Sequence, residues 1–265
     1  MSVDTWILTA AFLLAATLYS SVGHAGASAY LAAMAFLGLP TPVMRPTALV
    51  LNLLVASITA IRFGRAGFFS WRLFWPFALG SIPFAFVGGG ITLPGHWYRT
   101  LVGLVLWAAA LRLWLDVRWT RTIHHPPVVG AVLWGAAIGM LAGLTGTGGG
   151  IFLSPLLLFM GWAETRATGG VAAVFILANS AAGLAGNPGS LGNLPPQLPL
   201  WASTVVVGGI VGAEVGSRRI GTPMFRRLLG VVLAIFGTRV LGGALEKSVK
   251  AIEERNYPGL GKVMS

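Results

Sequence analysis

The sequence predicts an all-α, polytopic membrane protein made of two pseudo-symmetric repeats. Of its 265 residues, 55% are hydrophobic and only 9% are charged, and the mean hydropathy is +0.80. Soluble domains carry about 25% charged residues, so this composition cannot supply a solvated surface. Several apolar runs approach or exceed the roughly 20 residues that a membrane-spanning helix needs. The runs are continuous rather than alternating, which excludes a transmembrane β-barrel.

The charge pattern and the cysteine count exclude several classes of function. The net charge is +11, and the basic residues lie at the ends of the apolar runs. That pattern is typical of loops in membrane proteins, so we expect a lipid bilayer as partner and no nucleic acid. The chain has no cysteine, and therefore no disulfide and no thiolate ligand. Because intramembrane carboxylates are almost lacking and no histidines pair on a helix face, neither a metal nor another cofactor is expected.

The repeat is seen when the two halves are aligned without gaps. "YRTLVGLVLWAAALRLW" (98–114) matches "FRRLLGVVLAIFGTRVL" (225–241) at six positions. "GHAGASAYLAAMAFLG" (23–38) matches "GTGGGIFLSPLLLFMG" (146–161) at three glycines. We therefore divide the chain into a first repeat, a basic linker, a second repeat and a polar tail. Their ranges are 5–116, 117–127, 128–243 and 244–265.

Each repeat is predicted to contain the same series of helices. An apolar helix leads into a glycine-rich break, a short apolar helix follows, and three full spans complete the repeat. In the first repeat these are 5–21, 27–39, 44–62, 72–91 and 97–115; in the second, 128–144, 150–161, 165–185, 200–220 and 224–243. Turn-forming residues fill the loop at 186–199.

The repeats are expected to be inverted relative to each other. Residues 5–39 would form a straight helix about 52 Å long, against a hydrocarbon core of about 30 Å. A chain that bends at the glycines and returns makes each repeat cross an odd number of times. This returning model puts eleven arginines on one side and only Arg45 and Arg99 on the other, before the tail. Eight plain spans would divide the same residues six to seven, so the positive-inside rule favours the returning model.

The glycine breaks are the candidate substrate site. A helix that starts inside the membrane presents free N–H groups and a partial positive charge, which suit an anion. The alternative is that the glycines only let helices pack closely. The candidate ligands from the two breaks are His24, Gly26 and Ser28, and Thr145, Gly146, Thr147, Gly148, Gly149 and Gly150.

Polar residues in the spans after each break extend this candidate site. Their amides and hydroxyls can contact an anion or bridge helices, and the sequence does not decide between the two. In the first repeat they are Thr47, Asn52 and Ser57, and in the second Thr168, Asn179 and Ser180.

Two further residues are candidates for proton coupling. His24 can titrate near neutral pH, and Glu214 is an acid well inside a predicted span. The alternative for Glu214 is an ion pair with Arg218, four residues along the same helix. We interpret Arg45 and Arg166, at the starts of two spans, as interfacial anchors rather than ligands.

The doubled unit resembles the sulfite exporter TauE/SafE family of membrane permeases. The resemblance rests on the breaks "GHAGA" and "GTGGG", the short helices that end in glycine, and the openings "YRTLVGLVL" and "FRRLLGVVL". It covers about residues 5–243. It implies secondary transport of small anions such as sulfite, sulfoacetate or thiosulfate across a bacterial inner membrane. The first repeat departs from the glycine-rich pattern at His24, Ala25 and Ala27.

The predicted function is therefore a secondary transporter of a small sulfur-containing or organic anion. An enzyme is not expected, because "GTGGG" lacks both the G-x-G-x-x-G spacing and the Gly-Lys-Ser/Thr of a phosphate loop. The alternatives are an anion channel and a non-transporting scaffold for membrane assembly. Protons are a candidate coupling ion, and a homodimer is left open.

Overall fold

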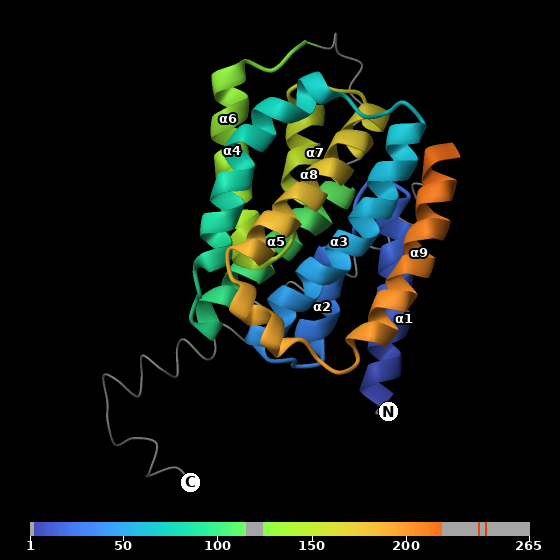
Figure 1. Cartoon of the computed structure of the whole chain (residues 1–265), viewed down its shortest axis with the longest axis vertical. Coiled ribbons are helices and arrows are strands. Elements are labelled where there is room, and N and C mark those ends of the chain that lie inside the picture. Colours follow the sequence, from blue (N-terminus) through green and yellow to red (C-terminus); the bar gives the residue numbers. More distant parts are fainter. Residues whose placement is uncertain (1–2, 115–123, 219–237, 239–241, 243–265) are drawn as a thin grey trace.

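The computed structural model describes residues 3–114, 124–218, 238 and 242. Within these ranges the chain is helical and has no β-strand (Figure 1). The elements are α1 (Val3–Ser20), α2 (Ala27–Phe36), α3 (Thr41–Arg65), α4 (Trp71–Gly90), α5 (Gly95–Trp114), α6 (Val128–Thr145), α7 (Gly150–Phe159), α8 (Thr165–Ala185), the 3₁₀ helix η1 (Pro188–Asn193) and α9 (Leu198–Arg218). The predicted span at 224–243 and the tail at 244–265 lie almost wholly outside the described residues, and the linker lies partly outside them.

Six of these helices are long and apolar enough to cross a membrane. They are α1, α3, α4, α6, α8 and α9. Helix α5, which we expected to be a full span, is not one of the six. The loop expected at 186–199 contains the short helix η1, which a cluster of turn-forming residues does not distinguish from an irregular loop.

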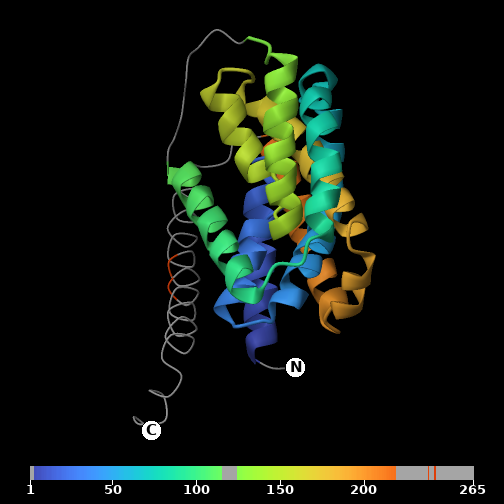
Figure 2. The same ribbon diagram turned by 90° about the vertical axis from the view of Figure 1, so that its left-hand side faces the viewer.

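The helices run between two ends of the molecule. The lower end carries the start of α1, the turn between α2 and α3, and η1; the upper end carries the turn between α3 and α4 (Figure 1). Helix α1 rises from the lower end, α2 returns toward it, and α3 rises again. Helices α6, α7 and α8 repeat this course in the opposite sense, descending, returning and descending (Figures 1 and 2).

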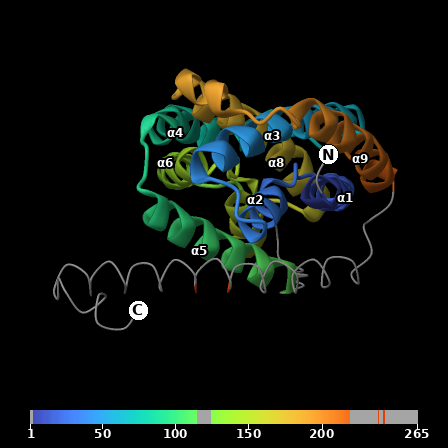
Figure 3. The same ribbon diagram turned by 90° about the horizontal axis from the view of Figure 1, so that it is seen from below.

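Two pairs of helices from different halves of the chain pack closely along rows of glycines, which we call glycine seams. Helix α4 packs along α6, and α1 packs along α9, each pair running parallel. A Cβ atom on Gly80 of α4 would overlap the backbone of Val132, and one on Gly212 of α9 would overlap that of Thr17. Small residues of this kind let membrane helices approach closely. Seen from below, the pairs lie on opposite sides of α3 and α8 (Figure 3).

The buried side chains form two hydrophobic clusters. One is built mainly from α1, α2, α3, α5 and α9, with Phe12, Tyr30 and Leu51 at its centre. The other is built from α4, α6, α7 and α8 around Phe77 and Phe175. Helices α3 and α8 face each other across the boundary between the clusters, which is where the predicted site lies.

Candidate substrate-binding site

The first glycine segment, residues 21–26, connects α1 to α2. Gly23 has φ +85° and Gly26 has φ +102°, in the left-handed region that glycine adopts without strain. A Cβ atom on Gly23 would overlap Gly169 of α8, so this position also requires the absence of a side chain. The first segment therefore rests on a span from the other half of the chain.

The second glycine segment, residues 146–149, connects α6 to α7 in the same manner. Gly146, Gly148 and Gly149 all have positive φ, between +72° and +83°. A Cβ atom on Gly146 would lie 3.1 Å from Cγ of Arg45, near the start of α3. Each glycine segment thus contacts the early part of a span from the other half.

The short helices α2 and α7 start at these segments without side-chain caps. The cap residues are Gly26 and Gly149. The first intrahelical hydrogen bonds in α2 run from Ala29 and Tyr30 to the Gly26 oxygen, and in α7 the first is from Phe152 to Gly149. The N–H groups of the two preceding residues in each helix have no carbonyl within the helix to bind. Two helix N-termini, each with a partial positive charge, therefore open into the buried interior.

His24 joins the first segment directly to the first turns of α7. Its side chain is 2% exposed, and its Nε2 lies 3.1 Å from the carbonyl oxygen of Gly150 and 3.0 Å from Oγ of Ser154. Its Nδ1 lies 3.2 Å from the carbonyl oxygen of Val22. A neutral imidazole has one N–H, whereas the imidazolium ion has two. Only the doubly protonated ring can therefore donate to both carbonyl oxygens.

The amide of Asn52 meets the second segment from α3. Its Nδ2 donates a hydrogen bond of 3.4 Å to Oγ of Ser180 in α8, and both side chains are fully buried. A Cβ atom on Gly148 would lie 2.9 Å from each of these two atoms. The structure therefore brings together Gly148, Asn52 and Ser180, three residues that the sequence nominated separately.

We call the place where the two glycine segments, Asn52 and Ser180 come together the glycine junction. Several buried polar atoms at or near this junction have no hydrogen-bond partner within the described part of the chain. They include Oδ1 of Asn52, Oδ1 of Asn179 and the hydroxyl of Thr168. Asn179 donates its Nδ2 to the Phe175 carbonyl, within α8. Buried polar atoms nearly always have partners, so unpartnered atoms of this kind indicate a place for a ligand or an ordered water.

The remaining residues of the two breaks bond to one another or to neighbouring aromatics. The hydroxyls of Thr145 and Thr147 are 2.9 Å apart, and the Thr145 carbonyl accepts a hydrogen bond of 3.0 Å from the Tyr98 hydroxyl. Ser28 donates to the Tyr19 hydroxyl at 2.8 Å. These bonds fix the walls of the junction.

Three candidate residues make contacts away from the junction. The hydroxyls of Ser57 and Thr47 donate to carbonyl oxygens within α3, at 2.7 Å in each case. Glu214 forms an ion pair with Arg62 of α3, a partner from another helix that sequence spacing could not identify. Both members of this pair are partly exposed.

Our interpretation of Arg45 as an interfacial anchor is wrong. Its side chain is buried, and Nη1 donates a hydrogen bond of 2.8 Å to the carbonyl oxygen of Ile91. Arg166 is exposed, and its guanidinium lies over the ring of Phe68 at 5.2 Å, as an anchor would. Both arginines lie near helix starts, so nothing in the sequence separated the buried one from the exposed one.

Comparison with known proteins assigns the family. Residues 8–240 match the family model described as sulfite exporter TauE/SafE. The chain belongs to the TauE/SafE family. A probable membrane transporter protein, y4hK, of Sinorhizobium fredii is 38% identical over 239 residues, which cover 88% of this chain and 97% of the relative. No solved structure matches the chain.

The family also fixes the general class of activity. With six apolar helices, this TauE/SafE protein is a multi-pass membrane transporter. The family and the name of the relative indicate a transporter rather than an enzyme. The resemblance carried by the glycine breaks and the repeated helix openings is thereby confirmed.

Proposed function

We propose that the protein is a secondary transporter of a small sulfur-containing or organic anion, such as sulfite, sulfoacetate or thiosulfate. The anion binds where the two glycine segments meet. The observation that carries this proposal is the contact of His24 with Gly150, which places the uncapped starts of α2 and α7 at one buried junction.

The electrostatics of the junction support an anion rather than a cation. Free N–H groups and aligned peptide dipoles at helix N-termini attract negative charge. The acids within the described ranges are Asp4, Glu164 and Glu214, which lie at or near helix ends. Asp4 and Glu164 are exposed, and Glu214 is paired with Arg62 of α3.

The two halves of the chain form an inverted repeat, and each glycine-broken pair of helices is re-entrant. The opposite courses of α1–α3 and α6–α8 support this arrangement (Figures 1 and 2). The α1–α9 seam also has its counterpart in the α6–α4 seam, as an inverted repeat requires. Substrate sites at such repeat interfaces are a recurring feature of secondary transporters.

The upper end faces the cytoplasm of a cell whose inner membrane holds the protein. The helix ends there carry Arg62, Arg65, Arg72 and Arg166, whereas the helix starts at the lower end carry Arg45 and Arg99. The positive-inside rule assigns the arginine-rich end to the cytoplasm. Transport is coupled to protons through His24 rather than Glu214, because the Glu214 carboxylate is already paired with Arg62.

Uptake by purified protein in liposomes tests the proposal. Gly148→Ala places a methyl group 2.7 Å from Ile176 and 2.9 Å from Asn52, inside the junction. We expect uptake of the transported anion to fall at least tenfold. The matched control is Gly67→Ala, which has the same positive φ but open space around the new methyl group. Equal uptake in both variants would place the substrate elsewhere.

A binding measurement identifies the anion. Wild-type protein in detergent is melted in the presence of sulfite, thiosulfate, sulfate, sulfoacetate, acetate and lactate. A ligand present at about 100 times its Kd adds roughly 2.7 kcal/mol to the free energy of unfolding and raises Tm. One anion should give a saturable shift that Gly148→Ala removes and Gly67→Ala retains.

A further inference from the structure

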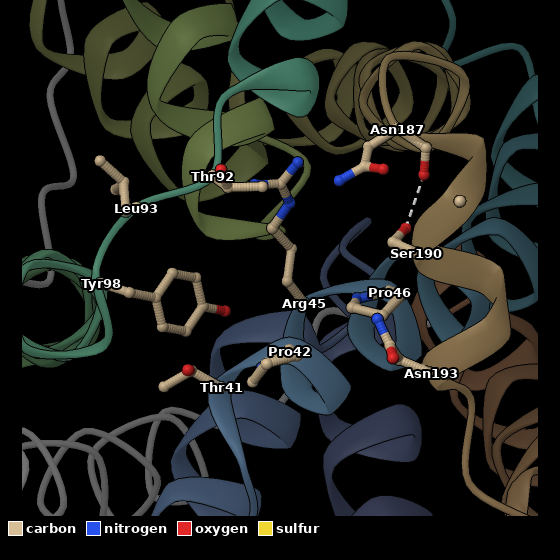
Figure 4. Close-up of a pocket in the computed structure, with 11 residues that line it drawn as sticks. Thr41, Pro42, Arg45, Pro46, Thr92, Leu93, Tyr98, Asn187, Ser190 and Asn193 are labelled. Atoms are coloured by element: carbon tan, nitrogen blue, oxygen red, sulfur yellow. Dashed lines mark hydrogen bonds between the residues drawn. The ribbon is translucent and has the colours of Figure 1, made fainter.

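A separate pocket lies at the lower end of the molecule, outside the glycine junction. Its volume is about 220 Å³, and it is lined by the starts of α3 and α5, the turn after α4, and η1 (Figure 4). Its polar lining includes Thr41, Thr92, Asn187, Ser190 and Asn193. Pockets for drug-sized ligands are about 300–1,000 Å³, so this one suits a smaller molecule.

Arg45 supplies a cation to this pocket that no described carboxylate neutralises. The residue is 9% exposed, and its guanidinium lies between Thr92 and Asn187 (Figure 4). Nη1 donates to the Ile91 carbonyl, whereas Nη2 is buried without a hydrogen-bond partner in the described part of the chain. The ion pair found within the described ranges joins Arg62 to Glu214, at the other end of α3.

A buried guanidinium without a counter-ion is costly to retain. Charged residues at membrane depth are rare and generally mark ligand or ion pathways. Arginine also presents N–H donors in a planar fork that fits the oxygens of an oxyanion. These properties indicate that the partner missing from Nη2 is an anion.

The pocket is connected to the second glycine segment through two of its own residues. The side chain of Arg45 lies against Gly146, since a Cβ atom there would be 3.1 Å from Cγ. Tyr98, on the opposite wall, donates to the Thr145 carbonyl, and the Thr145 hydroxyl lies 2.9 Å from that of Thr147. Pocket and junction therefore share a wall.

We infer that the Arg45 pocket is a second, outward-facing site for the transported oxyanion, which the anion occupies on its way to or from the glycine junction. This inference rests on the proposed function. The ligand is a small carboxylate, sulfonate or sulfite-type anion whose oxygens accept hydrogen bonds from Nη2 of Arg45. The hydroxyls and amides around the guanidinium supply further donors. Its position at the lower end makes it the site that the non-cytoplasmic solution reaches first.

Transport kinetics test the role of the guanidinium. Arg45→Gln should raise KM for thiosulfate or sulfoacetate at least tenfold in liposomes, and Arg45→Lys should recover part of the loss. The control is Arg166→Gln, at the start of another span, which should keep KM within twofold. Wild-type KM in Arg45→Gln would overturn the second site. Failure of wild-type protein to transport any anion of the panel would instead overturn the proposed function.

A second measurement leaves Arg45 in place and does not depend on the folding of that variant. Because the chain has no cysteine, Ser190→Cys provides a single thiol on the pocket wall. Saturating thiosulfate should slow its alkylation by a water-soluble maleimide at least fivefold, but should leave Gly67→Cys at the upper end unaffected. Equal alkylation rates with and without thiosulfate, in protein that transports thiosulfate, would also overturn the inference.

Discussion

His24 is the residue through which the first glycine segment contacts the start of α7. A carbonyl oxygen lies beside each of its ring nitrogens, and the centroid of the Tyr19 ring is 6.5 Å from that of the His24 ring. The imidazolium ion can donate to both oxygens and adds positive charge beside the proposed anion site. Protonation of His24 should therefore strengthen substrate binding.

We expect uptake of thiosulfate to rise as the pH falls, because only the doubly protonated His24 ring can donate to both carbonyl oxygens. Thiosulfate is the suitable probe because its own charge is constant near neutral pH. His24→Gln retains an N–H donor but cannot gain charge, so its uptake should be independent of pH. The control is His96→Gln, on the exposed start of α5. A pH response that survives in His24→Gln would remove this residue from proton coupling.

Several residues of the junction could be predicted from the sequence, but their contact partners could not. The consecutive glycines, His24 and Asn52 were identifiable because polar or flexible residues in an apolar run need a local reason. Their mutual contacts depend on how α3 meets α8, which is a tertiary property with no signature in either segment. Arg45 was missed for the same reason, since burial of an arginine near a helix start depends on loops from distant parts of the chain.

The α4–α6 seam depends on glycine at regular positions. A Cβ atom on Gly139 would overlap the backbone of Ser81, and one on Gly143 would overlap that of Ala85. Backbone atoms cannot move aside as a flexible side chain can, so the helices must separate. Overpacking of this kind typically costs about 1–3 kcal/mol.

We expect Gly139→Ala to lower the Tm of the protein in detergent by several degrees. The matched control is Gly64→Ala in α3, where no atom lies within 4 Å of the new methyl group. Alanine also favours the helix over glycine by up to about 1 kcal/mol, so the control should be neutral or stabilising. Equal melting temperatures for the two variants would mean that the seam tolerates a wider spacing.

The helices themselves were largely predictable, while their pairing was not. Apolar runs and glycine or proline boundaries predicted the nine α-helices of the described ranges to within a few residues. Helix α3 begins at Thr41 rather than at residue 44, because Pro42 is well placed in a first helical turn. The parallel seams could not be foreseen, because glycines spread along an apolar helix do not reveal which neighbour they face.

The proposed orientation in the membrane can be tested with single cysteines in an otherwise cysteine-free chain. Gly189 lies in η1 at the lower end, and Gly67 lies in the turn after α3 at the upper end, so Gly189→Cys and Gly67→Cys place one thiol at each end. A membrane-impermeant maleimide should label the first in intact cells, and the second only after the membrane is permeabilised. Labelling of both from outside, or the reverse order, would contradict the assigned orientation.

The two seams also determine which parts of the molecule can move as blocks. Each seam fastens a helix from one half of the sequence to a helix from the other, α1 to α9 and α4 to α6. The two hydrophobic clusters follow these seams rather than the repeat boundary. Any blocks that move in the proposed transport cycle are therefore composites, each assembled from helices of both halves of the sequence, and α3 and α8 lie between them. If the chain were cut between α5 and α6, neither fragment could form either block without the other fragment.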